Sequence, residues 1–240
     1  MRSRVLVIVP AYNEAATIGA VLEGLRRDAP GCDLLVVNDG STDDTGRIVA
    51  GLEDVALIQL PYNLGIGGAM QTGFKYALRN GYDVAVQCDA DGQHPADEVG
   101  TLVERVERGV ADLVIGSRYV ADTGYAPTVY RRVGKSLLSR LVDRIIGGGI
   151  TDTTSGFRAL NREVLALFAR QYPEDYPEPE TLISLHKAGL KAAEAPVTMH
   201  ERQGGRTSIG PKNAVYYMVK VMLAIFVGAF RAPARAPKGR

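Results

Sequence analysis

The chain has 240 residues, 46% of them hydrophobic and 23% charged, which is ordinary for a globular protein and enough to bury a sizeable core. Its formal net charge of +1 excludes nucleic-acid binding that is driven by a large overall positive charge, so we expect no nucleic-acid partner. The two cysteines, Cys32 and Cys88, lack metal-ligand spacing and fit a reducing compartment. The first apolar run, residues 5–10, is too short for a signal peptide, so we expect a cytoplasmic protein.

The first half of the chain alternates apolar runs with amphipathic segments. The apolar runs are typical of strands buried on both faces and span residues 5–9, 34–37, 55–58, 84–87 and 113–116. The amphipathic segments predict helices over about 15–27, 44–52, 65–80 and 96–108. This alternation predicts an α/β fold with a mostly parallel, Rossmann-like sheet flanked by helices. In such folds ligands bind beyond the carboxyl ends of the strands.

The second half of the chain is less regular. Helices are predicted over 131–146, 163–170 and 181–188, a polar turn over 152–158 and a strand over 192–199. The chain contains no internal repeat and no clear linker. We therefore expect one domain over residues 1–212, followed by a C-terminal extension over 213–240.

The C-terminal extension combines an apolar segment with a basic tail. Residues 213–230 carry a single charge, Lys220, and four basic residues follow between Arg231 and Arg240. Because a full membrane span needs about 20 apolar residues, this segment is marginal as a span. Two interpretations stay open: a helix at an anionic membrane surface, or a helix packed on the domain, in a homodimer or against a membrane protein.

Two carboxylates at alternate positions, Asp89 and Asp91, follow the fourth predicted strand. Like charges this close are costly unless a cation joins them. A divalent ion such as Mg or Mn accepts oxygen ligands, Gln93 adds a neutral one, and a diphosphate can complete the shell. His94 is better interpreted as a hydrogen-bonding residue than as a metal ligand. An Asp-x-Asp also occurs in solvated turns, and its place at a strand end, before Gly-Gln-His, favours the metal site.

Polar residues also follow the first three predicted strands, at the same expected edge of the sheet. Tyr12 can stack on a base, Glu14 can accept a hydrogen bond from a ribose hydroxyl, and Asp39 can accept one from a base or ribose. Asn63 is a possible wall of the same site, and the glycines of residues 65–68 are interpreted as allowing close helix packing. Each cluster can also be explained as a helix cap or a turn.

Together these motifs resemble family-2 glycosyltransferases of the GT-A fold, over about residues 3–210. The resemblance rests on six motifs: residues 9–14 (VPAYNE), 38–43 (NDGSTD), Asn63-x-Gly65-x-Gly67-x-Ala69, 89–94 (DADGQH), 116–118 (GSR) and 152–158 (DTTSGFR). The last four are similar to the polyprenyl-phosphate subgroup, which includes dolichyl-phosphate mannose synthase-like enzymes. Two departures stand out. Asn38 replaces the usual first Asp, and Ser208 stands where relatives carry a lysine.

The resemblance and the motifs together imply a role for each matching residue. The expected donor-binding residues are Pro10, Ala11, Tyr12, Glu14, Asn38, Asp39, Asn63, Asp89, Ala90, Asp91, Arg202 and Arg206, the last two on a loop that closes on the diphosphate. The expected metal ligands are Asp89, Asp91 and Gln93. The expected acceptor-phosphate ligands are Arg118, Arg131 and Arg158. The expected catalytic set is Asp89, Asp91, Asp152, Arg118 and Arg131.

The implied activity is inverting transfer of a sugar from GDP-mannose or a UDP-sugar to polyprenyl or dolichyl phosphate, at the cytoplasmic face of the membrane. A phosphate acceptor is already ionised and needs no strong base. A hydroxyl acceptor needs one, for which Asp152 is the first candidate and Glu180 the second. The alternatives are transfer to a saccharide hydroxyl, a nucleotidyltransferase, and a non-catalytic nucleotide-binding protein at the membrane. Residues 11–14 lack the basic Gly-rich loop that is usual in nucleotidyltransferases.

Overall fold

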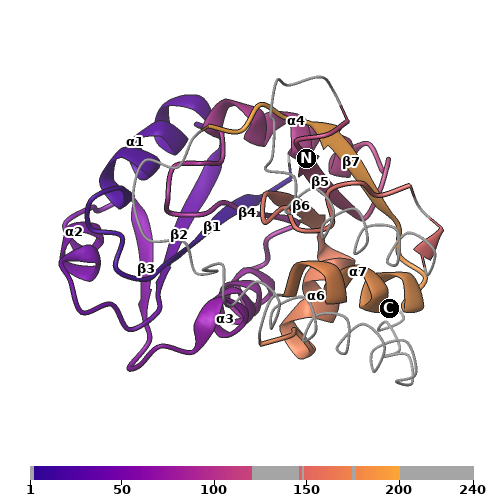
Figure 1. Ribbon diagram of the computed structural model, residues 1–240. Helices are drawn as coiled ribbons and strands as arrows, with labels where there is room; N and C mark the ends of the chain where they lie inside the picture. The colour runs from indigo at the N-terminus through magenta and orange to yellow at the C-terminus, as the bar shows by residue number, and fades with distance from the viewer. Residues whose placement is uncertain (1–2, 121–145, 148, 175–176, 201–240) are drawn as a thin grey trace, which may run out of the picture.

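The structure is a computed structural model that describes residues 3–120, 146–147, 149–174 and 177–200. A seven-stranded sheet lies at the centre of the described part (Figure 1). Its strands are β1 (Val5–Ala11), β2 (Cys32–Asn38), β3 (Val55–Gln59), β4 (Val84–Gln87), β5 (Leu113–Ser117), β6 (Arg158–Asn161) and β7 (Ala192–Pro196). The order is β3-β2-β1-β4-β6-β5-β7. The mostly parallel sheet is confirmed, since only the two pairs made by β6 are antiparallel.

Helices cover both faces of the sheet, as predicted (Figure 1). They are α1 (Ile18–Asp28), α2 (Thr45–Ala50), α3 (Gly65–Arg79), α4 (Val99–Glu107) after a 3-10 turn η1 (Ala96–Glu98), α6 (Arg162–Arg170) and α7 (Pro177–Lys187). Leu6 and Ile8 of β1 pack in the core beside α3, α6 and α7. Val7 and Val9 of the same strand pack in the core beside α1, α2 and α4. This alternation explains why the apolar run of β1 has no polar face.

The second half of the chain shows three main differences from the predicted elements. Strand β6 was not predicted, because its four residues follow a polar turn and form a strand only by pairing between β4 and β5. Helix α7 begins at Pro177 rather than at 181, since proline is tolerated in a first helical turn. Strand β7 ends at Pro196 rather than at 199. The predicted helix over 131–146, except for its last residue, and the extension over 213–240 lie outside the described residues.

None of the helices in the described ranges combines the length and the apolar character needed to cross a bilayer. The described helices instead bury one side against the sheet, where they contribute to its two hydrophobic cores. Residues 213–230 lie outside the described ranges, so their contact with a membrane stays a prediction.

Gly67 lies where the first turn of α3 meets the segment before α7. Its N–H donates to the Glu174 carbonyl at 3.2 Å, and an added Cβ would lie 2.1 Å from the Pro173 carbonyl oxygen. Because this obstacle is backbone, we expect Gly67→Ala to lower the free energy of unfolding by about 2–3 kcal/mol in chemical denaturation. Gly19→Ala in α1 is the matched control, since no atom lies within 4 Å of its added Cβ. It should change stability by less than about 1 kcal/mol, and equal losses would contradict the prediction.

Candidate active site

The polar clusters predicted at the strand ends meet at one edge of the sheet. Strands β1, β2 and β4 are parallel, with Ala11 opposite Asn38 and Ile8 opposite Gln87. Beyond the strands, the N–H of Asp39 donates to the Ala11 carbonyl at 2.8 Å. The carboxyl ends of these strands therefore lie side by side, which is where α/β folds bind their ligands.

The segment after β1 and the segment after β2 form one side of this edge. Tyr12 is 48% exposed, so its ring is available to stack on a flat ligand. Glu14 accepts a hydrogen bond from the Thr17 hydroxyl at 2.9 Å. The Asn38 amide nitrogen donates to Gln59 Oε1 at 2.8 Å, and its oxygen accepts from a backbone N–H of the following turn. Asn38 thus braces the ends of β2 and β3, a role that a carboxylate would fill less well.

Asp39 connects the end of β2 to the turn before α3. Its carboxylate is almost fully buried, and Oδ1 accepts the Leu64 N–H at 2.7 Å. Burial raises the pKa of Asp39, while the N–H groups of Leu64 and Gly65 oppose this shift. Asn63 lies in the same turn, where its side chain accepts the Gly65 N–H at 3.0 Å. Asp39 and Asn63 therefore lie together, as predicted.

The loop after β4 holds the two carboxylates in different ways. Asp91 is 4% exposed, and its Oδ1 accepts the Gln93 N–H at 3.0 Å, which closes a tight turn. Asp89 donates its N–H to His94 Nδ1 at 2.9 Å, and His94 Nε2 lies 3.6 Å from Asp89 Oδ2. The His94 ring stacks on Phe157 at a centroid distance of 5.0 Å. These contacts agree with the hydrogen-bonding interpretation of His94.

One carboxylate oxygen of this loop lacks a hydrogen-bond partner in the part of the chain that the structure describes. Asp89 Oδ1 is buried and accepts no hydrogen bond within the described residues. A buried carboxylate oxygen in that state is costly, so a cation is a fitting partner. Gly156 borders the carboxylate closely, because an added Cβ would lie 3.3 Å from Asp89 Oδ2 and 3.0 Å from Gln87 Nε2. The residues present therefore fit a metal ion.

The protein alone does not complete a metal shell in the described ranges, where no group of three or more His, Cys, Asp or Glu residues is arranged to hold a metal. Two carboxylates and the amide oxygen of Gln93 leave positions for oxygens of a ligand such as a diphosphate. The backbone oxygen of Gln93 accepts the N–H of His200 at 2.9 Å, so the last described residue lies beside this loop.

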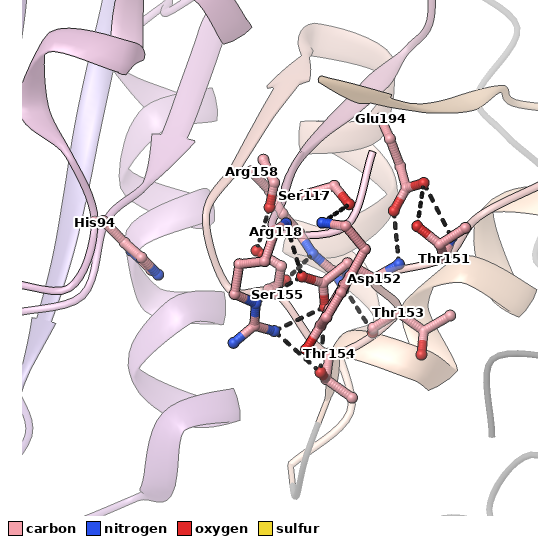
Figure 2. Close-up of polar contacts among 12 residues, drawn as sticks. His94, Ser117, Arg118, Thr151, Asp152, Thr153, Thr154, Ser155, Arg158 and Glu194 are labelled. Carbon is pink, nitrogen blue, oxygen red and sulfur yellow. Dashed lines mark hydrogen bonds and ion pairs between the residues drawn. The ribbon is translucent and has the colours of Figure 1, made fainter. Parts of the chain in front are cut away.

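Arg118 and Asp152 form an ion pair next to this edge (Figure 2). Arg118 follows β5, and its Nε and Nη2 donate to the two oxygens of Asp152, each at 2.7 Å. Asp152 is fully buried and also accepts the Arg118 backbone N–H at 3.2 Å. Both oxygens of the Asp152 carboxylate are therefore engaged by one guanidinium in a planar, charge-assisted pair. The geometry therefore argues against Asp152 as a general base.

Arg158 occupies a different environment from the one predicted. Its side chain is 2% exposed, and its guanidinium donates to the carbonyls of Thr153, Ser155 and Glu178 and to the Thr181 hydroxyl. Burial lowers its pKa, and the acidic groups around it oppose this shift. These bonds connect β6 to the first turn of α7. The arrangement argues against Arg158 as an acceptor-phosphate ligand, because its donors are engaged by the protein itself.

Two carboxylates near the site were not predicted to be part of it. Glu178 is half-buried in the first turn of α7; burial raises its pKa, and Arg158 opposes this shift. Glu194 lies on β7 and binds the segment before Asp152. The Pro-Glu-Pro-Glu run of residues 177–180 is a local pattern that could have drawn attention to Glu178, whereas no local pattern marks Glu194. Glu180, the second candidate base, is half-buried in the same turn of α7.

Three predicted site residues lie outside the described ranges: Arg131, Arg202 and Arg206. Their roles stay predictions. Asp152 lies in the segment before β6, and Arg158 is the first residue of β6. The remaining candidates, Pro10, Ala11 and Ala90 included, lie on β1 or follow the carboxyl ends of β1 to β5. The structure therefore brings the residues after β1 and β2, the carboxylate pair and Arg118 to this part of the molecule, and their roles in binding stay predictions.

The chain is similar to known proteins over most of its length. The model of glycosyl transferase family 2 matches residues 6–168. The polyprenol monophosphomannose synthase of Mycolicibacterium smegmatis is 34% identical, over 91% of this chain and 85% of the relative. The undecaprenyl-phosphate mannosyltransferase of Micrococcus luteus is 35% identical, over 86% of this chain and 87% of the relative.

A solved structure has the same fold. The glucosyl-3-phosphoglycerate synthase of Mycobacterium tuberculosis, crystallised with Mn²⁺, uridine diphosphate and phosphoglyceric acid, superposes with a TM-score of 0.72. It is 23% identical, and the match covers 97% of this chain and 80% of that one. At this identity the likeness shows the fold alone, and it confirms the expected GT-A architecture.

Proposed function

The chain belongs to glycosyl transferase family 2, and from this membership we propose that it moves a sugar from a nucleoside diphosphate to a polyprenyl phosphate. The observation that supports binding of the donor is the buried Asp89 oxygen, which has no hydrogen-bond partner among the described residues and lies at the same edge as Tyr12 and Asp39. The acceptor half is supported by two relatives, above one-third identity, whose names specify polyprenol and undecaprenyl phosphate chemistry.

The nucleoside would lie against Tyr12, Asp39 and Asn63. Tyr12 offers an exposed ring, while Asp39 and Asn63 shape the turn before α3 through the Leu64 and Gly65 N–H groups. Pro10, Ala11, Glu14 and Asn38 form the strand ends behind them. Both GDP-mannose and a UDP-sugar remain candidate donors, because Asn38 is engaged by Gln59 and carries no charge.

Asp89, Asp91 and Gln93 are the residues that would hold Mg or Mn, with Ala90 between them. When bound, the ion would neutralise negative charge on the departing diphosphate. The fold neighbour crystallised with Mn²⁺ and uridine diphosphate supports this assignment. The contribution of the chain itself is to hold Asp89 through the His94 ring and to fix Asp91 through the Gln93 N–H.

Arg118 and Arg131 would bind the acceptor phosphate, and Arg202 and Arg206 would bind the donor diphosphate. A guanidinium presents a planar pair of donors that suits phosphate oxygens. Because a phosphate acceptor is ionised at neutral pH, no protein base is required, which agrees with the pairing of Asp152 to Arg118. Arg158 is omitted from this set and assigned to holding α7.

The acceptor lipid would bring the enzyme to the inner face of the cell membrane. The segment that would serve there is 213–230, which is apolar and precedes a tail with four basic residues and no acid. A basic tail is attracted to anionic lipid surfaces. A homodimer or a membrane protein partner through the same segment is the other arrangement to be tested.

The test is a donor and acceptor screen with the full chain. GDP-mannose and several UDP-sugars are offered with undecaprenyl phosphate or with saccharide acceptors, and nucleotide release and products are measured by mass spectrometry. We expect one donor to give a lipid-linked sugar of inverted anomeric configuration, with activity lost in chelator and restored by Mn or Mg. Transfer to saccharide hydroxyls alone would contradict the lipid acceptor, and full activity in chelator would contradict the metal.

A further inference from the structure

Glu194 holds the segment that precedes the Arg118–Asp152 pair. It lies on β7, opposite Ile115 of β5, the strand that leads to Arg118. One carboxylate oxygen accepts the Thr151 N–H at 3.0 Å and the Thr151 hydroxyl at 2.9 Å, and the other accepts the Asp152 N–H at 2.6 Å (Figure 2). Glu194 thus fixes the backbone on which the Asp152 carboxylate is carried.

Asp152 in turn fixes the guanidinium of Arg118. The two side-chain bonds at 2.7 Å hold the guanidinium in one plane, and the 3.2 Å bond from the Arg118 backbone ties the end of β5 to the same carboxylate. The Thr154 hydroxyl lies 3.3 Å from Arg118 Nη2 and 3.4 Å from Asp152 Oδ1. Arg118, Asp152 and Glu194 therefore form a continuous chain of contacts from β7 to the acceptor side of the site.

We propose that Glu194 and Asp152 are positioning residues that set Arg118 in the orientation required to bind the acceptor phosphate. The proposal rests on the acceptor role of Arg118 in the proposed function. An arginine side chain has many rotamers, and ordering it only when the ligand arrives reduces the affinity. An arginine already held in one plane avoids that loss.

The burial of this cluster supports a positioning role for Glu194. Asp152 is fully buried, and a buried ion pair stabilises a fold only when its geometry is excellent and its remaining oxygens are bonded. Asp152 reaches the guanidinium in the observed geometry only if the backbone of residues 151–152 stays against β7, where Glu194 holds it. A loss of Glu194 should therefore move Arg118, although the two residues share no hydrogen bond in the described structure.

The experiment compares Glu194→Ala with Asp112→Ala. Asp112 is the matched control, because its carboxylate lies at the start of β5 and β7, at the other end of β5 from Arg118. It accepts the Lys191 backbone N–H at 2.7 Å and the Asn161 side-chain N–H at 2.8 Å. We expect Glu194→Ala to raise KM for undecaprenyl phosphate about tenfold, with the donor KM and the affinity for Mn-nucleotide within about twofold. Asp112→Ala should lower the melting temperature without changing the KM for the lipid.

A double variant decides whether Glu194 acts through Arg118. If it does, the double variant of Arg118→Ala and Glu194→Ala should have the same KM for the lipid as Arg118→Ala alone. If the two residues act independently, the fold-increases in KM of the two single variants should multiply. An unchanged lipid KM in Arg118→Ala would refute the acceptor assignment in the proposed function. A raised KM in Arg118→Ala with an unchanged KM in Glu194→Ala would overturn the positioning proposal alone. If Glu194→Ala does not fold, Glu194→Gln, which keeps one acceptor oxygen, should show a smaller rise in KM for the lipid.

Discussion

Asp89→Asn should reduce sugar transfer by at least about a hundredfold and yet leave the metal-free protein as stable as the parent or more stable. The Asp89 side chain is 37% exposed, but its Oδ1 is buried with no hydrogen-bond partner in the described structure, so leaving this oxygen unpaired costs some folding energy unless a cation is present. Asparagine keeps the shape of the side chain and removes the charge. The change therefore relieves that cost while removing a ligand for the metal and the diphosphate.

Urea denaturation with and without Mn, beside a transfer assay, measures both effects. The parent should be stabilised by Mn and nucleotide together, and Asp89→Asn should lose that stabilisation. The control is Asp83→Asn. Asp83 directly precedes β4, at the end of the strand away from Asp89, and its exposed carboxylate accepts the Arg4 N–H at 2.9 Å, so transfer should be unchanged. Normal transfer by Asp89→Asn, or a loss of several kcal/mol in the metal-free protein, would be incompatible with a metal-binding Asp89.

Arg158→Met should lower the free energy of unfolding by about 3–5 kcal/mol. The guanidinium is buried and satisfies carbonyls of Thr153, Ser155 and Glu178, which would be left without this donor in an interior that water does not reach. For a domain of this size, such a loss corresponds to a fall in melting temperature of roughly 10 °C. Because these bonds hold the first turn of α7, transfer should fall as well.

Thermal and urea denaturation of Arg158→Met and Arg162→Met measure this effect against a control. Arg162 is exposed and donates one hydrogen bond, from Nη1 to the Tyr82 carbonyl at 2.9 Å, so its loss should cost less than about 1 kcal/mol. If Arg158 bound the acceptor phosphate instead, Arg158→Met would raise the KM for the lipid and leave stability nearly unchanged. That result would restore the role first predicted for it.

Local patterns in the sequence were enough to predict the layered fold and one edge of the site. Runs such as residues 5–9 and 34–37 are apolar throughout, and only a strand covered on both faces needs that composition. Parallel strands place their carboxyl ends at the same edge, so the polar residues after β1, β2 and β4 had to meet. The placement of Asp39 and Asp89 at the same edge of the sheet followed from topology and needed no knowledge of side-chain contacts.

The other half of the site was decided only by tertiary structure. Arg118 pairs with Asp152, which is 34 residues away, and Asp152 is braced by Glu194, a further 42 residues along. Arg158 became an interior residue because β6 pairs antiparallel between β4 and β5, which no run of residues 158–161 could signal. By itself the sequence determined periodicity, turns and strand-end chemistry, because these depend on neighbours along the chain. The partner of each charge depends on which strands lie side by side, and folding alone brings those partners together.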